Sequence, residues 1–284
     1  MSKLFERYQP RYIFVSALAL GALVIWSVLF RAERDVLSVA FLDVGQGDAI
    51  FIESPSGNQV LIDGGPNKKI LSELSSVMPF YDRSIDILIL SHPHQDHIGG
   101  LVEILKRYDI DFVFSSGSDA PIAEYAEWSK LIKEKGVKEV LAQRGLRLNL
   151  GDGVYFDVLL PEKIGGGENL HKNMVVSRLS YGRNCFLFMG DAERDLELKI
   201  LNDDIHCEVL KVGHHGSKTS SGEAFLNKVS PEVAVIQVGT KNRYGHPYQT
   251  ILERLAAASA KIFRTDTDGA IIIESDGKNI SIKK

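Results

Sequence analysis

The chain has few cysteines and no excess of positive charge, and each shortage argues against a class of protein. Only two of its 284 residues are cysteines, Cys185 and Cys207, and they form no CxxC pair. Neither a cysteine zinc site nor a disulfide framework is indicated, so we predict two small hydrophobic residues on strands. The formal net charge is -4, which argues against a surface that holds nucleic acid by charge alone.

Repeats, low-complexity tracts and internal linkers are also lacking. The composition, 44% hydrophobic and 25% charged, is ordinary for a globular protein, and the length allows one large domain with a short appendage or two small domains. Strand and helix signals alternate from Val36 onward. We predict one α/β domain over residues 36–284, with two mixed sheets sandwiched between helices.

One long apolar segment precedes this pattern. Residues 12–30 carry no charge and are about long enough to cross a hydrocarbon core of ~30 Å as a helix. Flanking basic residues slightly favour the N-terminal side, which predicts a cytoplasmic N-terminus (residues 1–11) and a catalytic domain outside a bacterial cytoplasmic membrane. A cleaved signal peptide is the alternative, but no A-x-A-like site follows. We therefore predict a single-pass anchor at residues 12–30.

The most informative stretch is HPHQDH, which directly follows a short apolar run expected to be a buried strand. It places three imidazoles and a carboxylate within six residues. These groups suit zinc, manganese or iron, and packing them together without a cation would cost free energy. We predict that His92 and His94 share one ion, and that Asp96 and His97 share a second ion close by.

Further polar residues follow predicted strands downstream. Asp191 ends the apolar run NCFLFMGD, and a bridging position between two cations would compensate its charge; the alternative role is to cap the following helix. His214 and His215 end CEVLKVG, where one can bind metal and the other face a substrate. His246 lies at a turn before a helix.

These motifs resemble a known family. HPHQDHIGG matches the HxHxDH signature of the metallo-β-lactamase superfamily. More narrowly, FLDVGQGDAIFIE, LIDGG, SHPHQDHIGG, FMGDAE, LKVGHHGSKTS and NRYGHP occur in the order found in the metallo-β-lactamase-like domain of ComEC-type DNA-uptake competence proteins. The resemblance covers the chain from Val36 onward. It implies an αββα sandwich with a metal site at one edge between the sheets, and metal-dependent hydrolysis, with a phosphodiester in DNA as the expected substrate.

The predicted centre holds two divalent ions, Zn²⁺ or Mn²⁺, with Asp191 bridging them. Its metal ligands are His92, His94, Asp96, His97, Asp191 and His215. Analogy with phosphodiesterases that carry a paired histidine favours His215 as the ligand and His214 as the substrate-facing group, although the sequence alone does not order the pair. His246 is a second candidate to stabilise or protonate the leaving group. The residues expected in catalysis are Asp96, His214 and His246.

Metal binding would lower the pKa of water from 15.7 to about 7, which makes hydroxide available at neutral pH. The ions would also supply the positive charge that the chain lacks. Asp63, in LIDGG, is expected to orient a ligand histidine. In DVGQGDA, Asp43, Gln46 and Asp48 either line the same edge or serve the turn.

Two features depart from the resemblance. ComEC is a many-helix membrane channel, whereas this chain has one predicted membrane segment, so a separate membrane channel is a candidate partner. Superfamily members often place a histidine ligand at the position of Asn173. ComEC-like domains commonly have an asparagine there, as this chain does. We therefore expect the ion at His92 and His94 to be less completely ligated, with His171 as a candidate additional ligand.

Together these features predict an anchored phosphodiesterase or nuclease acting on extracellular DNA, with single-stranded DNA as a candidate partner. One alternative is hydrolysis of another envelope phosphoester: a teichoic acid, phosphocholine, a nucleotide or a lipid headgroup. A lactone or β-lactam hydrolase is disfavoured by the HHGS and GHP elements. A binding protein that has lost its metal is the last alternative. No oligomeric state is predicted.

Overall fold

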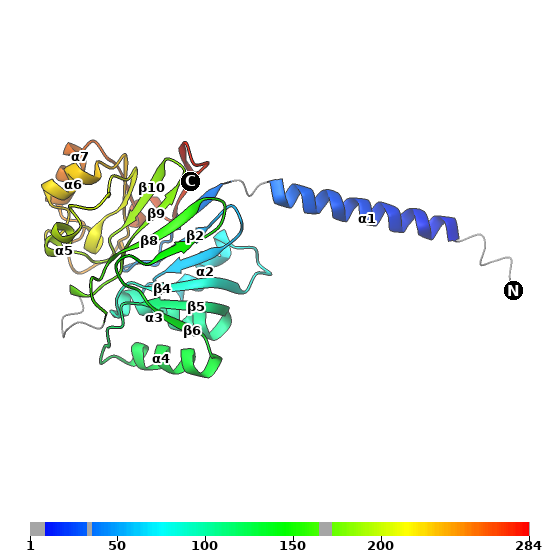
Figure 1. Cartoon of the computed structure of the whole chain (residues 1–284), viewed down its shortest axis with the longest axis horizontal. Helices are drawn as coiled ribbons and strands as arrows, with labels where there is room; N and C mark the ends of the chain where they lie inside the picture. The colour runs from blue at the N-terminus through cyan, green and yellow to red at the C-terminus, as the bar shows by residue number, and fades with distance from the viewer. Residues whose placement is uncertain (1–8, 33–35, 165–171, 284) are drawn as a thin grey trace.

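β-Branched and aromatic runs pair into two stacked sheets in the computed structural model, which describes residues 9–32, 36–164 and 172–283. Helices cover the outer face of each sheet (Figure 1). The predicted αββα architecture is therefore confirmed.

The first sheet has eight strands and is mixed. Its strands pair antiparallel from β15 to β3 and parallel from β3 to β6. In order across the sheet they are β15 (Ile280–Lys283), β14 (Ile271–Ser275), β1 (Leu37–Phe41), β2 (Ile50–Glu53), β3 (Gln59–Ile62), β4 (Ser84–Leu90), β5 (Asp109–Ser115) and β6 (Lys138–Leu141). Its outer face packs against α2 (Lys69–Val77), α3 (Gln95–Arg107) and α4 (Ala123–Lys135).

The second sheet has seven strands and is also mixed. Its strands pair antiparallel from β7 to β10 and parallel from β10 to β13. In order they are β13 (Lys261–Arg264), β12 (Val233–Ile236), β11 (Val209–Lys211), β10 (Asn184–Phe188), β9 (Val176–Tyr181), β8 (Val154–Leu160) and β7 (Arg147–Asn149). Its outer face packs against α5 (Arg194–Lys199), α6 (Glu223–Val229) and α7 (Gln249–Ala257). A short helix, α8 (Thr265–Asp268), follows β13.

The apolar core forms three layers. The central layer lies between the sheets and includes the stacked rings of Phe156 and Phe188, whose centroids are 6.4 Å apart. The other two layers lie between each sheet and its helices. β10 is buried at every position, which explains its continuous apolar sequence, because both of its faces are covered.

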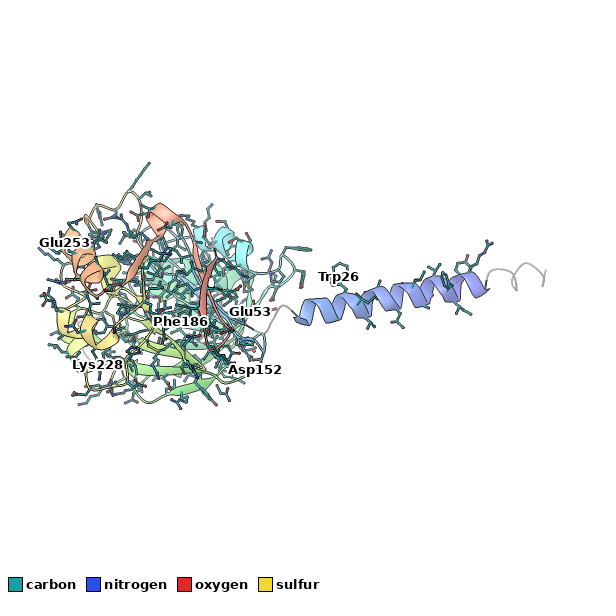
Figure 2. The ribbon with its side chains drawn as sticks, turned by 90° about the horizontal axis from the view of Figure 1, so that it is seen from above. Trp26, Glu53, Asp152, Phe186, Lys228 and Glu253 are labelled. Atoms are coloured by element: carbon teal, nitrogen blue, oxygen red, sulfur yellow. A yellow bond between two sulfur atoms is a disulfide. The ribbon has the colours of Figure 1, made fainter. Side chains whose placement is uncertain are left out.

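The N-terminal apolar segment is helical but does not meet the requirements of a membrane span. α1 (Gln9–Ala32) lies to one side of the sandwich, and Figure 2 shows this helix with Trp26 labelled on it. Among the residues that the structure describes, no helix combines the length and the hydropathy needed to cross a bilayer. The predicted localisation, a single pass through a cytoplasmic membrane with the domain outside, is therefore wrong, and the anchor at residues 12–30 lacks support.

The two cysteines form a disulfide. Cys185 in β10 is bonded to Cys207, which lies just before β11, and both side chains are buried. β10 and β11 are neighbouring parallel strands in which Phe186 pairs with Val209, so the two cysteines lie beside each other near the starts of these strands. The prediction of two separate small hydrophobic residues is therefore wrong, because the two side chains are joined.

Candidate metal centre

The candidate site lies where strands of both sheets end. His92 and His94 follow β4, Asp191 follows β10, and His215 lies in the 3₁₀ turn η2 (Gly213–Gly216) that follows β11. Carboxyl ends of parallel strands share one edge of a sheet, and ligand sites of α/β proteins gather at such edges. The sandwich brings the edges of its two sheets together at this point.

The second half of the HPHQDH motif is helical. α3 begins at Gln95, so Asp96 and His97 lie in its first turn. His94 is the extended residue that starts the helix, and its carbonyl accepts hydrogen bonds from the backbone N–H groups of His97 and Ile98. This geometry turns Asp96 and His97 toward the strand ends.

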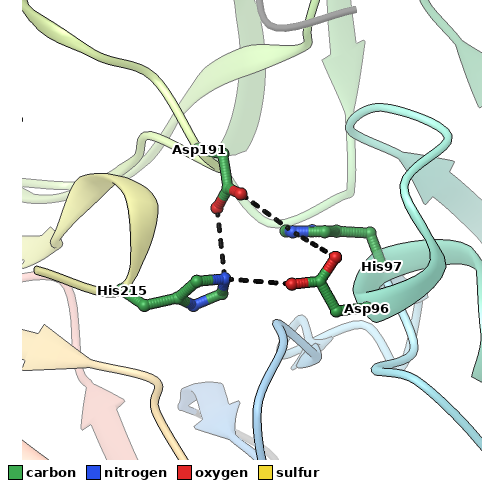
Figure 3. A group of neighbouring side chains, drawn as sticks. All are labelled: Asp96, His97, Asp191 and His215. Atoms are coloured by element: carbon green, nitrogen blue, oxygen red, sulfur yellow. Dashed lines mark ion pairs between the residues drawn. The ribbon is translucent and has the colours of Figure 1, made fainter. Parts of the chain in front are cut away.

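Four side chains form the first group: Asp96, His97, Asp191 and His215 (Figure 3). The two Asp191 oxygens lie 3.4 Å from His215 Nε2 and 3.4 Å from His97 Nε2. The Asp96 carboxylate lies 3.5 Å from His215 Nε2 and 3.9 Å from His97 Nε2. Two imidazoles and two carboxylates thus point their ligand atoms at one another.

A second group joins the first through Asp191. His92 Nε2 and His94 Nδ1 are 2.8 Å apart, and His92 Nε2 is 3.8 Å from Asp191 Oδ2. The Asp191 carboxylate therefore reaches both groups, which is the placement expected of a bridging ligand. The alternative role of Asp191 as a helix cap is not observed, because α5 begins after Glu193 and has no side-chain cap.

Hydrogen bonds at Nδ1 orient two of the candidate metal ligands, His97 and His215. His97 Nδ1 donates to Asp63 Oδ2 at 2.8 Å, the contact predicted for Asp63, and His215 Nδ1 donates to the Gln237 carbonyl at 2.8 Å. Within the described part of the chain, His97 Nε2, His215 Nε2 and Asp191 Oδ1 are buried without a hydrogen-bond partner. Buried polar atoms without partners are costly, and this donor set fits a divalent cation.

The pKa values of His97 and His215 indicate which positive charges a bound cation would replace. Although burial opposes it, the Asp191 and Asp63 carboxylates raise the pKa of His97 well above its usual value. Burial likewise opposes, but Asp191 and Asp48 raise the pKa of His215 to about 10. Protons on these two imidazoles therefore balance the carboxylates in the metal-free protein.

The pKa values of His92, Asp191 and Asp96 are lowered instead of raised. Burial, followed by the charge of His97, lowers the pKa of His92 well below its usual value. Although burial raises the pKa of the Asp191 and Asp96 carboxyls, the histidines around them outweigh it and lower both values. Neutral His92 and ionised aspartates are the forms that bind metal.

A buried ion pair beside these ligands was not predicted. Asp48 is buried and pairs with Lys211, whose ammonium also donates to the Gly190 carbonyl at 2.8 Å. Asp48 therefore belongs to the site edge and not only to a turn. The sequence signal for Lys211 was a lone cation at the end of the apolar strand CEVLK.

A pocket of about 630 Å³ opens beside the metal centre. Its walls include His94, Asp96, Asp191, His214, His215 and His246, together with Gln46, Lys241, Arg243 and Tyr244. Sequence reasoning missed Lys241, Arg243 and Tyr244, which lie in a turn between β12 and α7. Their only signal was their position beside the GHP element.

The structure places both His214 and His246 in the lining of this pocket. His214 Nδ1 lies 3.1 Å from Glu193 Oε1, and His214 Nε2 lies 3.7 Å from Asp191 Oδ2. η2 holds His214 and His215 in successive left-handed conformations, with φ of 47° and 52°, a strained arrangement that is typical of functional sites. Burial, followed by the charges of His215 and His214, lowers the pKa of His246 to about 4.

Three other residues considered for the site, Asn173, Asp43 and His171, are not placed among the candidate metal ligands. Asn173 is buried and its amide donates to Ser118 Oγ at 2.6 Å. Asp43 serves the turn, because its carboxylate accepts the Gly45 backbone N–H at 3.1 Å. His171 lies outside the described residues.

Comparison with known proteins agrees with this geometry. A sequence profile described as the metallo-beta-lactamase superfamily matches residues 42–240. ComE operon protein 3 of Bacillus subtilis is 32% identical over 252 residues, which cover 82% of this chain and 32% of that protein. Recombination protein 2 of Haemophilus influenzae is 31% identical over 252 residues, which cover 86% of this chain and 30% of that protein.

The chain thus spans about a third of the length of these curated relatives. Among solved structures, the metallo-beta-lactamase fold protein YhfI from Bacillus subtilis superposes with a TM-score of 0.57 at 14% identity. The superposition covers 84% of this chain and all of YhfI, 100%. At this identity the likeness concerns the fold alone.

Proposed function

The chain belongs to the metallo-beta-lactamase superfamily, and on that premise we propose that it is a metal-dependent phosphodiesterase that cleaves DNA. One observation carries the proposal: Lys241 and Arg243 line the same pocket as the metal-ligand candidates Asp191 and His215. A phosphodiester is anionic, so cations beside the reacting centre attract it and hold it there. The net charge of -4 belongs to the whole chain, whereas an anionic substrate in the pocket would lie beside Lys241 and Arg243.

The candidate ligands His92, His94, Asp96, His97, Asp191 and His215 would hold two divalent ions, Zn²⁺ or Mn²⁺. Bound ions would activate water and polarise the phosphoryl oxygens. His214 lines the pocket, and its Nδ1 lies 3.1 Å from Glu193 Oε1, which leaves Nε2, 3.7 Å from Asp191 Oδ2, as the nitrogen that would donate a hydrogen bond to a phosphoryl oxygen.

His246 has a narrower role than the sequence suggested. With a pKa of about 4 it is neutral near pH 7. A neutral imidazole donates a hydrogen bond to a developing charge but is a poor source of a proton for the leaving group. We therefore assign His246 to binding or stabilising the substrate instead of to general acid catalysis.

The relatives support DNA over other phosphoesters. One of them is named for recombination, a process whose material is DNA. Teichoic acid, phosphocholine and nucleotide esters are also anionic, and the pocket cations alone do not separate them from DNA. These esters, and a lactone or β-lactam, are outcomes of the following test.

The test compares Asp191→Ala with the wild-type chain on single-stranded DNA, bis-p-nitrophenyl phosphate, a phosphocholine ester and nitrocefin, each with Zn²⁺ or Mn²⁺. We expect wild type to cleave single-stranded DNA and bis-p-nitrophenyl phosphate, and Asp191→Ala to lose metal-dependent turnover while its circular dichroism is unchanged. The matched control is Asp195→Ala, an exposed carboxylate in the first turn of α5. Full activity of Asp191→Ala would refute the metal centre, whereas turnover of nitrocefin or the choline ester alone would refute the DNA substrate.

A further inference from the structure

An exposed aromatic ring stands at the rim of the pocket. Tyr244 lines the pocket and its side chain is 50% exposed. Its ring stacks on that of His246, with centroids 5.6 Å apart and planes 24° apart. His246 in turn neighbours His215, with centroids 6.4 Å apart and planes tilted by 31°. The rings of His215, His246 and Tyr244 therefore form a row from the candidate metal centre to the pocket rim, in which only the outer pair is stacked.

The turn that carries these rings is fixed by one side chain. The Asn242 amide donates to the carbonyls of Gly239 and His246, and its oxygen accepts the His246 backbone N–H. Gly245 has φ of +71°, a conformation that glycine adopts without strain. The backbone on either side of Tyr244 is thereby held in place before any ligand arrives, and the stacking on His246 limits the positions of its ring, which lowers the entropy cost of binding.

The charges around the ring favour an anion. The Arg243 guanidinium lies 5.3 Å from the centre of the Tyr244 ring, and Lys241 lines the same pocket. Both side chains are exposed, so a flat ligand can displace the guanidinium from the ring while the cation remains beside it. A quaternary ammonium such as choline would be repelled by two neighbouring cations, although aromatic rings alone bind it well.

Resting on the proposed phosphodiesterase function, we propose that Tyr244 is the base-stacking platform of a subsite for single-stranded nucleic acid, with Arg243 and Lys241 binding the flanking phosphates. A cationic groove combined with an aromatic ring is the usual means of holding a single strand, and stacking tolerates any base. A base must leave its helical stack to use such a ring, which favours a single strand over a duplex.

The experiment combines a protein change with a substrate change. Cleavage of an oligothymidylate by the full chain with Mn²⁺ is compared with cleavage of the same strand carrying one abasic residue, placed at each position in turn. We expect Tyr244→Ala to lower kcat/KM on the intact strand about tenfold. We expect an abasic residue at one position to cost wild type about the same, and to cost Tyr244→Ala nothing further, because the two changes remove one contact.

Two matched variants complete the design. Tyr244→Phe retains the ring and is expected to act like wild type. Tyr155 has the same arrangement away from the pocket, since it is 38% exposed with the Arg147 guanidinium 5.3 Å from its ring centre. Tyr155→Ala is therefore expected to leave cleavage within about twofold of wild type. Fluorescence anisotropy of EDTA-treated protein with the same strands should show the same dependence on Tyr244.

The failures are distinguishable. If wild type cleaves DNA but the Tyr244→Ala and abasic losses multiply, the stacking subsite is wrong and the proposed function stands. If Tyr244→Ala impairs cleavage of a phosphocholine ester but not of the oligonucleotide, the ring serves a choline ligand and the subsite is again wrong. If wild type cleaves bis-p-nitrophenyl phosphate but neither binds nor cleaves any strand, the DNA substrate and this subsite both fail.

Discussion

The Lys211 ammonium forms a fully buried ion pair with Asp48 beside the candidate metal centre. The same ammonium donates to the carbonyl of Gly190, the residue before Asp191. The other Asp48 oxygen lies 3.3 Å from His215 Nδ1. One ion pair therefore supports the backbone beside Asp191 and faces His215, both of them candidate metal ligands.

Lys211→Met should weaken both the fold and the metal centre. It leaves Asp48 buried without its partner, which costs about 3–5 kcal/mol, and loss of a contact behind metal ligands typically costs about 10–100-fold in metal affinity. Urea unfolding measures the first effect, and competition with a chromophoric chelator measures the second. The double variant Asp48→Asn/Lys211→Met, which buries no lone charge, should recover part of the stability. Unchanged stability and affinity in Lys211→Met would contradict this role.

Metal binding should strengthen as the pH rises. The pKa of His97 is raised, and that of His215 is raised from 6.5 to about 10, so an ion must displace protons from both. In the metal-free protein, the stability from these raised values is complete below about pH 6.5 and is lost as the pH rises toward 10. The lowered pKa of Asp191 contributes stability above about pH 4 that is lost as the pH falls.

The check is thermal unfolding of EDTA-treated and Mn²⁺-loaded protein from pH 5 to pH 9. The metal-free protein should lose stability across the upper part of this range, and the increase in Tm on adding Mn²⁺ should grow with pH. A constant increase in Tm at every pH would show that no protons are displaced.

Reduction of the Cys185–Cys207 disulfide should destabilise the second sheet. The bond closes a loop with a sequence separation of 22 residues, for which chain entropy predicts about 3 kcal/mol. Urea unfolding with and without a reductant measures the difference, and the Cys185→Ala/Cys207→Ala variant, which should not respond to the reductant, is the control. Two titratable thiols in denatured, unreduced protein would contradict the bond.

Sequence reasoning located the ligand candidates because each follows a strand signal. The HPHQDH motif, Asp191 and His215 sit at strand ends, and parallel strands place such ends together. The fold class followed from the same alternation of strands and helices. These signals are local in the sequence, so they can be recognised without knowing the order of the strands in each sheet.

Contacts that depend on strand order escaped prediction. Cys185 contacts Cys207 because β10 and β11 are neighbours in the second sheet. Asp48 contacts Lys211 because the second sheet packs on the first. Tyr244 reaches the pocket through a turn that Asn242 closes. Such pairings are set by tertiary packing, which periodicity along the chain does not report.

Gly100→Ala should displace the helix that carries Asp96 and His97. A Cβ atom on Gly100 would lie 1.8 Å from the Gly64 carbonyl oxygen, and backbone hydrogen bonds from Gly64 to His97 and from Gly100 to Gly65 join α3 to the loop after β3. The helix must therefore shift away from this loop, which carries Asp63.

Such overpacking costs about 1–3 kcal/mol, and the shift should also lengthen the His97–Asp63 contact and weaken metal binding. Urea unfolding and chelator competition measure the two effects, with Lys106→Ala, an exposed position on α3, as the control. Wild-type metal affinity in a destabilised Gly100→Ala protein would mean that the neighbouring loop yields while His97 stays in place.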